Sequence, residues 1–381
     1  MILNLNISLI GTVRDCEALR YEWTELLETH QNATPFETFE WTVANLASFE
    51  NDGIRILVFR NRDGILVGIL PFVRRRGRRY TRTRDWWELA GMPHADYGAC
   101  IVRQGFELKV AEDFIEHLRS TTASWDAIHL EKLRERDPFI SPMMSVARSH
   151  NIYVVCRMSH QIRRLTRQTY ATKGSAGVRP SKSLIRARKR LEALGKLNFE
   201  VSTEDQTIQD RLDRYFQMHI ERFASKGLQS PFVREQHKKF FRTIAHECAP
   251  RGYVRLCSLC VNGFSIATKL TLTYGHTMHL YSTCFAKEFS QYSPSMLHLD
   301  MLLQYAFANQ IAVVDFGIGE SPQKEQAGAI VEETLVQIEL YKKRLPLVES
   351  QLFHAVSGLQ EKSGLLRKSG KLLRKLLPYR M

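Results

Sequence analysis

The feature that most constrains the fold is a pattern that occurs twice along the chain. Gly53 and Gly64 bracket one run of strand-forming residues, and Gly252 and Gly263 bracket a second at a constant offset of 199 residues. Upstream, Pro35-Phe36 and Pro231-Phe232 recur at an offset of 196 residues. The repeat predicts two copies of one α/β domain, each with two helices leading into an antiparallel hairpin.

The length and hydropathy fit that prediction. The chain has 381 residues, of which 44% are hydrophobic and 25% are charged, so about two domains of roughly 150 residues could each bury a core. No apolar run approaches about 18 residues, so no membrane-spanning helix is predicted. The apolar start, Met1 to Ile10, lacks a basic lead and a cleavage site and is expected to form a first strand.

The cysteines indicate a reducing compartment and no metal site. There are seven, an odd and scattered set, which is typical of the cytoplasm and not of a disulfide framework. Cys257 and Cys260 have CxxC spacing, but they lie in a predicted strand, where residues three apart point to opposite faces. No second such pair follows, so burial is expected there and no bound metal.

The net charge of +14 is concentrated in three segments. Residues 74–84 hold seven arginines and no acid, residues 157–196 hold twelve lysines and arginines against one acid, and residues 362–381 hold seven basic residues and no acid. Such runs can be solvated faces, but this concentration predicts anionic partners: phosphates, nucleic acid or an acidic membrane surface.

Within the second copy, a strand is predicted at 277–285, a polar loop at 286–293, a helix at 294–309 and a short buried strand at 311–316. A basic helix is predicted at 181–194, after a flexible stretch near Lys173 to Gly177. A strand that opens into a helix N-terminus offers unpaired amides and a positive dipole end, which suits phosphate. An ordinary capped helix, with Ser293 or Ser295 as the cap, is the alternative.

An ordered series of short motifs runs through nearly the whole chain. It comprises Glu22-Trp23 with Leu26, Pro35-Phe36, Glu40-Trp41, Asp63-Gly64 through Leu70-Pro71, Arg186 to Leu191 with Gly195, His219-Ile-Glu-Arg222, Asn262-Gly263, Tyr292-Ser293-Pro294, and Asp315-Phe316-Gly317 with Gly319 and Lys324. The series resembles the double-domain GNAT acyltransferases of the CelD-like type, which are tied to cellulose or exopolysaccharide production and are distantly similar to Fem-type aminoacyl transferases.

The resemblance implies an α/β (α+β) fold with two tandem GNAT-like domains, each a mixed, mostly antiparallel sheet flanked by helices. We expect an N-terminal domain at 1–160, a basic linker and helix at 161–196, the domain with the donor site at 197–345, and a basic amphipathic tail at 346–381. The donor implied is acetyl-CoA or another acyl-CoA, without a metal. Its pyrophosphate would bind the backbone of Tyr292, Ser293, Pro294, Ser295 and Met296. The family commonly has Gly where this chain has Ser295.

The transfer requires a neutral amine attacking a thioester, a group that accepts its proton, and protonation of the leaving thiolate. The candidate groups are Asp315, Lys324, His219, Arg222 and Tyr281. His219 has a pKa range suited to a base, although a helix histidine can equally be structural. Asp315 ends a buried strand and needs a partner or a function. Lys324, at the position where the family has a Tyr-Lys pair and this chain has Gln323-Lys324, could stabilise developing negative charge or could be a solvent-exposed lysine.

These observations predict an N-acyltransferase that acts on an amine of a sugar or cell-envelope precursor. An aminoacyl-tRNA-dependent transferase is one alternative, in which tRNA is the only nucleic acid expected to bind. A catalytically degenerate scaffold in a polysaccharide-synthesis complex is another. We expect a cytoplasmic protein, and the leucine and lysine/arginine faces of residues 362–381 predict peripheral contact with an anionic membrane, unless the leucines pack on the domain.

Overall fold

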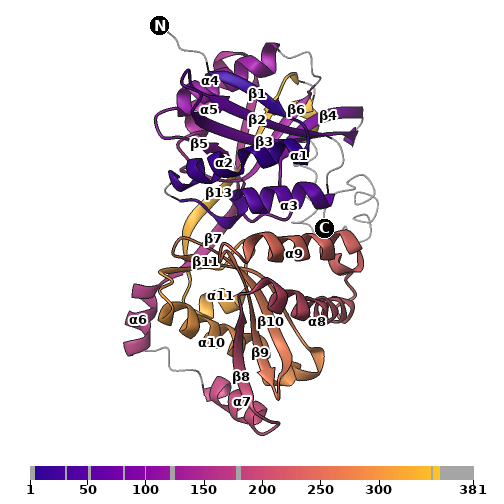
Figure 1. The fold of residues 1–381 in the computed structure, drawn as a ribbon, viewed down its shortest axis with the longest axis vertical. Coiled ribbons are helices and arrows are strands. Elements are labelled where there is room, and N and C mark those ends of the chain that lie inside the picture. Colours follow the sequence, from indigo (N-terminus) through magenta and orange to yellow (C-terminus); the bar gives the residue numbers. More distant parts are fainter. Residues whose placement is uncertain are drawn as a thin grey trace. The chain divides into compact units, whose positions relative to one another are not determined.

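The computed structural model describes residues 5–30, 32–49, 53–79, 82–98, 100–120, 125–176, 182–344 and 346–351. The predicted tail at 362–381 therefore lies outside the described residues. The chain forms two compact units, and the first combines residues 1–31, 50–159 and 336–381, while the second combines 32–49 and 160–335 (Figure 1). The units divide the chain differently from the predicted domains, because segment 32–49 belongs to the second unit and the chain after 335 returns to the first.

Unit 1 holds a mostly antiparallel sheet in the order β1-β2-β3-β4-β6-β13-β7. β4 and β6 run parallel, whereas β1, β2, β3 and β4 pair antiparallel. Its elements are β1 Asn6–Ile10, α1 Val13–Cys16, η1 Glu17–Leu19, α2 Arg20–Glu28, β2 Ile54–Arg60, β3 Leu66–Arg79, β4 Arg82–Leu89, β5 Ile101–Val102, α4 Glu107–Ser120, β6 Ala127–Arg134 and α5 Ile140–Ser149, with parts of β7 Tyr153–Thr166 and β13 Ile330–Tyr341.

Unit 2 continues from the remaining parts of β7 and β13 in the order β7-β12-β11-β10-β9-β8. Here β11 and β12 are the parallel pair. Its other elements are η2 Pro35–Glu37, α3 Phe39–Phe49, α6 Arg167–Ala176, α7 Lys182–Glu192, β8 Leu197–Ser202, α8 Asp205–Ala224, η3 Pro231–Val233, α9 Glu235–Cys248, β9 Val254–Val261, β10 Phe264–Tyr274, β11 Thr277–Phe285, η4 Lys287–Tyr292, α10 Pro294–Ala308, β12 Val313–Asp315 and α11 Pro322–Gln326.

The predicted repeat is confirmed by the order of elements. From β8 to β13 the α-helices and strands run as a strand, two helices, three strands, a helix, a strand, a helix and a last strand. From β1 to β7 the order is the same, with the short helix α1 and the short strand β5 added. In the first copy β4 pairs in parallel with β6, and in the second copy β11 pairs in parallel with β12. In each copy a helix lies between these two strands in the sequence. The fold is therefore of the predicted class, built from one α/β pattern used twice.

The two hairpin turns differ from each other. Asn262 and Gly263 both have positive φ, as a two-residue type I′ turn requires. At the other hairpin only Gly64 has positive φ, and the Asn61 side chain accepts hydrogen bonds from the amides of Asp63 and Ile65. Asp63-Gly64 therefore does not form such a two-residue turn, because the Asn61 side chain organises a wider loop.

Segment 32–49 packs on unit 2 through aromatic side chains. A capping box between Thr34 and Glu37 starts η2, and α3 lies against α9. The Trp41 ring stands edge-on to the Phe240 ring with centroids 5.3 Å apart. This segment is thus a 3-10 turn followed by α3, which starts at Phe39 after extended Thr38.

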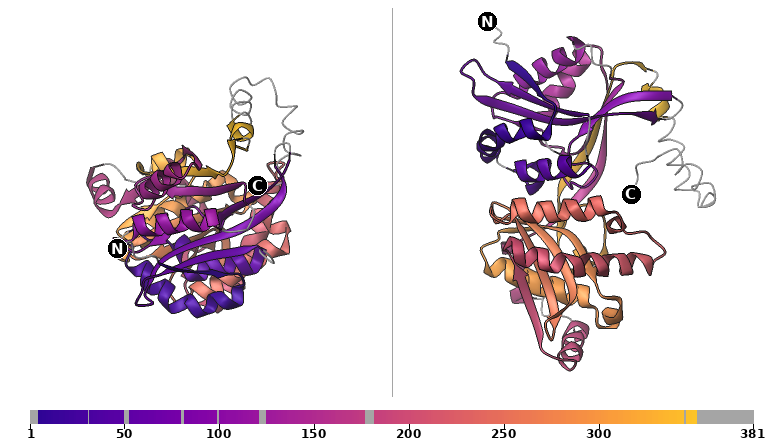
Figure 2. Two further views of the ribbon diagram at one scale, coloured as in Figure 1. Left: turned by 90° about the horizontal axis from the view of Figure 1, so that it is seen from above. Right: turned by 45° about the vertical axis from the view of Figure 1, so that its right-hand side comes forward.

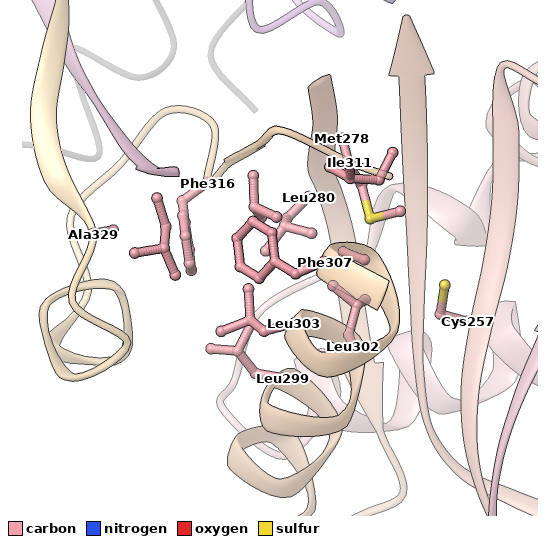
Figure 3. Close-up of a cluster of buried hydrophobic side chains, with 13 residues drawn as sticks. Cys257, Met278, Leu280, Leu299, Leu302, Leu303, Phe307, Ile311, Phe316 and Ala329 are labelled. Carbon is pink, nitrogen blue, oxygen red and sulfur yellow. The ribbon is translucent and has the colours of Figure 1, made fainter. Parts of the chain in front are cut away.

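Helices cover both faces of the unit 2 sheet. α8 and α9 lie side by side against one face (Figure 2), and α10 covers the other. Leucines and Phe307 of α10 point toward Met278, Leu280 and Phe316 (Figure 3). This apolar layer fixes α10 against β11, which places the helix N-terminus next to the end of that strand.

Candidate active site

Strand β11 has an open edge in the middle of unit 2. On one side it pairs with β10 along its length, and the register slips between Leu270 and Thr271 so that Tyr281 is an extra, bulged residue. On the other side it pairs with β12 only from Thr277 to His279. Beyond that point the two strands diverge, and among the described residues no strand covers this edge of β11 from Leu280 onward. Such an edge presents backbone donors and acceptors to a ligand, and bulges recur beside active sites.

The open edge leads to the N-terminus of α10. Ser293 sits between η4 and α10 in the left-handed conformation, with φ 50° and ψ 47°. Its carbonyl accepts from the amides of Met296 and Leu297 at 3.1 and 3.3 Å, while Pro294 fills the first helical position. Ser293 takes the cap position that the sequence predicted, but its side chain makes no capping bond. Pro294 has no N–H and the Met296 amide is bonded to Ser293, so this strained turn offers the Ser295 amide and the positive dipole end.

A basic helix flanks this turn, as the sequence predicted. α7 packs against α10 and η4, because its buried Leu191 joins the apolar cluster that holds Leu297 of α10. The guanidinium of Arg190 lies 4.7 Å above the ring of Tyr292. The stacking brings a fixed positive charge to the residue that precedes the turn.

Asp315 ends β12 at the point of divergence. Its carboxylate is fully buried and accepts from Arg164 Nε and from the Gly317 amide, both at 2.8 Å. The Nδ1 atom of His279, its neighbour on β11, lies 3.8 Å from Asp315 Oδ2. The carboxylate is therefore held by an arginine and a backbone amide, with the His279 imidazole beside it.

Lys324 is buried and ties down the loop after Asp315. Its Nζ donates to the carbonyl oxygens of Gly317, Ile318 and Gly319 at 2.8, 3.0 and 2.5 Å. The alternative of a solvent-exposed lysine is wrong, because only 9% of the residue is exposed. An ammonium whose three protons meet three carbonyls organises the loop, and this geometry favours a positioning role.

Tyr281 faces the opposite side of the sheet from α10, toward segment 32–49. Its ring centroid lies 5.7 Å from that of Phe36 and 5.4 Å from that of Trp41. Phe36 also stands edge-on to His279 at 5.8 Å. The bulged tyrosine and the histidine next to Asp315 thus share one aromatic wall.

His219 and Arg222 lie on α8 and differ in what they contact. The His219 Nδ1 atom lies 2.9 Å from Ser230 Oγ, and its ring stacks on Phe223. Burial, with a smaller effect of Arg222, lowers the pKa of His219 to about 4, so the imidazole is neutral and weakly basic. Arg222 donates to the Thr283 carbonyl at 3.3 Å and covers the Phe285 ring at 4.4 Å, so it touches β11 where the edge is open.

Asp315, His279 beside it and the Lys324 ammonium on the 317–319 loop thus lie near the divergence, with Tyr281 two residues after His279 on β11. Arg222 contacts β11 at Thr283, and residues 292–296 lie after β11, at the start of α10. His219 packs between α8 and η3, away from β11's open edge. Sequence reasoning missed His279, although a histidine two residues before Tyr281 on a predicted strand was a usable signal. Among residues described by the structure, no cluster of His, Cys, Asp and Glu could hold a metal ion, and no described helix is long and apolar enough to cross a membrane.

Residues 179–325 match the family model of the acetyltransferase (GNAT) domain. The match covers less than half of the chain and falls within unit 2. The protein is therefore an acyltransferase that contains a GNAT domain. Such a domain implies an acyl-CoA donor and an amine acceptor. None of the curated proteins matches the chain.

Solved structures show the same fold along most of the chain. FemX is 10% identical and superposes with a TM-score of 0.59, covering 90% of this chain and 98% of its own. The C-terminal domain of a protein described as a lysylphosphatidylglycerol synthetase from Agrobacterium fabrum is 11% identical, with a TM-score of 0.54 and coverage of 91% and 96%. L-PGS from Bacillus licheniformis is 11% identical, with a TM-score of 0.51 and coverage of 88% and 96%. At these identities the likeness concerns the fold alone.

Proposed function

We propose that the protein is an N-acyltransferase that moves an acyl group from acyl-CoA to an amine of a sugar or cell-envelope precursor, as in CelD-like proteins of exopolysaccharide or cellulose production. One observation carries the proposal: β11 diverges from β12 after His279, which leaves a strand edge open toward the N-terminus of α10. A pantetheine arm carries amides that suit such an edge, and a pyrophosphate suits the helix end.

In this proposal the donor lies along β11. Its pyrophosphate contacts the backbone of residues 292–296, and Arg190 on α7 adds positive charge beside Tyr292. The Ser295 side chain is half-buried at the second helical position, where a glycine would allow a closer approach of phosphate. We therefore expect binding of acyl-CoA to be weaker than in relatives with glycine at this position.

The proposed chemistry uses the groups at the divergence. The acceptor amine enters beside Tyr281 and the wall formed by Phe36 and Trp41. His279 and Asp315 accept the amine proton, directly or through water, and the Tyr281 hydroxyl protonates the leaving thiolate. Lys324 holds the 317–319 loop in place, and His219 supports α8.

The domain boundaries predicted from the sequence, at 1–160, 161–196, 197–345 and 346–381, also remain part of this proposal. In it the first domain has a mainly structural role.

Isothermal titration with acetyl-CoA and longer acyl-CoAs tests the donor. We expect micromolar to sub-millimolar dissociation constants, followed by thiol release when an amino sugar is added. An absence of binding at millimolar ligand would contradict the acyl-CoA proposal and favour the degenerate scaffold.

Aminoacyl-tRNA is the second candidate donor, and the basic helix α7 is the observation that favours it, since a row of exposed cations also suits an RNA backbone. The exposed cations of this helix are Lys182, Arg186, Arg188, Lys189 and Arg190. Gel-shift titration with tRNA at 50 and 200 mM salt separates the two donors. Salt-sensitive tRNA binding without acyl-CoA binding would replace the proposed donor.

A further inference from the structure

Three polar side-chain groups without a hydrogen-bond partner gather in unit 2 on the α10 side of the sheet, two on buried residues and one, a buried hydroxyl, on a half-buried residue. They are Lys269 on β10, Thr283 on β11 and His298 on α10. Lys269 is 9% exposed and His298 is fully buried. Neither His298 ring nitrogen nor the Thr283 hydroxyl has a partner, and Lys269 makes no hydrogen bond or ion pair with any described residue.

Strand register places Lys269 and Thr283 on the face of the sheet that α10 covers, and His298 belongs to that helix. Lys269 lies directly opposite Thr283 on one side and Cys257 on the other, and directly opposite residues point to the same face of a sheet. Cys257 packs with Leu299 and Leu302 of α10, so this row faces that helix. His298 belongs to the same helix, and the charge of Lys269 contributes to lowering its pKa.

Within the part of the chain that the structure describes, the surroundings offer no carboxylate to the lysine. Burial, with smaller effects of the cations Arg222 and Lys324, lowers the pKa of Lys269 to about 8 against the opposing thiols of Cys257 and Cys284. Burial and Lys269 together lower the pKa of His298 to about 3, against a weak opposing contact with the Cys257 backbone. The histidine is therefore neutral and can donate one N–H.

A buried charge is normally paired, because desolvation without a partner is costly. Here an ammonium, a hydroxyl and an imidazole N–H are all able to donate, and no carboxylate among the described residues receives them. The cluster also lies on the part of β11 whose edge is open, since Arg222 reaches the Thr283 carbonyl there. What the site lacks is an anionic oxygen group supplied from outside.

We propose that Lys269, Thr283 and His298 form an inner anion subsite that receives a carboxylate or phosphate oxygen of the donor. The inference rests on the proposed function and deepens it, because it assigns an anionic donor group to the interior of the site. A donor that presented a cationic α-amino group to this cluster would be repelled by Lys269, which disfavours aminoacyl donors there.

The test compares Lys269→Met, which keeps the length of the side chain and removes the charge, with Lys238→Met, which alters a half-buried lysine on α9 that pairs with Glu235. Acetyl-CoA, succinyl-CoA and free CoA are titrated calorimetrically into each protein. If the subsite takes an acyl carboxylate, the wild type binds succinyl-CoA at least tenfold more tightly than acetyl-CoA, and Lys269→Met removes that preference. If the subsite takes a phosphate, the affinity of Lys269→Met for all three ligands is at least tenfold lower than that of the wild type. Lys238→Met should match the wild type.

A change of less than twofold for every ligand in Lys269→Met would overturn the subsite. Thr283→Val gives a second measurement, because it removes only the hydroxyl. We expect its affinity to fall three- to tenfold for the ligand or ligands that Lys269→Met binds more weakly. If Lys269→Met does not fold, Lys269→Gln and Thr283→Val carry the comparison.

Inorganic pyrophosphate and succinate separate this inference from the proposed function. If the wild type binds no acyl-CoA, the proposed function fails, yet either anion should still raise the melting temperature of the wild type and not that of Lys269→Met. If acyl-CoA binds equally well to the wild type and the variant, and neither anion distinguishes them, the subsite fails while the proposed function stands.

Discussion

Arg164 on β7 lies directly opposite Asp315 on β12, and its Nε donates to Asp315 Oδ2 at 2.8 Å. The same guanidinium reaches Glu333 at 3.2 Å. The carboxylate at the divergence of β11 and β12 is therefore held in one orientation by a strand-to-strand contact, with His279 on its other side. In the proposed mechanism the arginine orients the carboxylate, and the imidazole passes the amine proton to it.

Asp315→Asn tests the proposed base. The amide keeps the size of the side chain and loses the charge, so we expect kcat for thiol release with an amino sugar to fall by about 10²–10⁴, while the dissociation constant for acyl-CoA changes little. Glu333→Gln is the matched control, because it removes the other partner of Arg164, and its kcat should stay within about threefold of the wild type. Equal kcat values for Asp315→Asn and the wild type would remove Asp315 from the mechanism.

Lys324→Met tests the positioning role of the buried lysine. The change leaves three loop carbonyls without their donor, and each buried unpaired group costs about 1–3 kcal/mol. We expect the free energy of unfolding in urea to fall by about 2–5 kcal/mol. Lys287→Met on η4 provides the control, since an exposed substitution changes stability by about 0.5 kcal/mol or less. If the urea concentration at the midpoint of unfolding is unchanged in Lys324→Met, the stability of the loop does not depend on this ammonium.

The sequence predicted the parts of the fold that depend on local patterns. The strand at 277–285 and the helix beginning at Pro294 follow from their apolar spacing and the proline, and both are present. It could not place segment 32–49 on unit 2, because the contact of Trp41 with Phe240 joins residues almost two hundred positions apart. Nor could it find the pairing of Lys269 with Thr283, which depends on a register slip at Tyr281 that no local motif encodes.

The same limit explains the site residues. Asp315 stood out because it ends a predicted buried strand, and Lys324 because of the family resemblance, but the role of the lysine depends on which carbonyls it meets. His219 was a candidate because of its pKa range and its place in the His219-Ile-Glu-Arg222 motif. Its contacts with Ser230 and Phe223 come from the packing of α8 on η3, which composition does not reveal.

Acid should weaken unit 1 through Glu339. Burial would raise the pKa of this carboxyl, but His129, Tyr341 and Arg157 outweigh it and lower the pKa from 4.5 to about 2. The unfolded chain therefore binds the proton first as the pH falls, so the stabilisation is complete above pH 4.5 and is lost between pH 4.5 and 2. Above that window Glu339→Gln should be less stable by about 2–3 kcal/mol, and the difference should vanish near pH 2 in acid unfolding followed by circular dichroism. Glu17→Gln, which alters an exposed pair with Arg20, should follow the wild type throughout.

Lys269→Met should make the ligand-free protein more stable. The pKa of Lys269 falls from 10.5 to about 8 in the folded state, so the folded chain releases its proton before the unfolded chain does. The penalty of the buried charge is complete below pH 8 and disappears as the pH rises toward 10.5. We expect the variant to gain roughly 1–3 kcal/mol at pH 7, and the gain to shrink above pH 8 in thermal unfolding at a series of pH values. A variant less stable than the wild type at pH 7 would show that the ammonium is paired.

Arg190→Met tests the basic helix beside the α10 N-terminus. The guanidinium lies over Tyr292, so its removal takes away a positive charge at the residue that precedes the phosphate-binding turn. We expect acyl-CoA to bind about three- to tenfold more weakly, with a shallower dependence of affinity on salt, because one charge contact with phosphate is worth about 1 kcal/mol. Arg186→Met removes a charge from the same helix without the contact to Tyr292, so it should change affinity by less than about twofold at 0.15 M salt, where exposed charges beyond about 8 Å are screened. Equal losses in the two variants would assign the effect to the general field of α7, and no loss in either would place the pyrophosphate elsewhere.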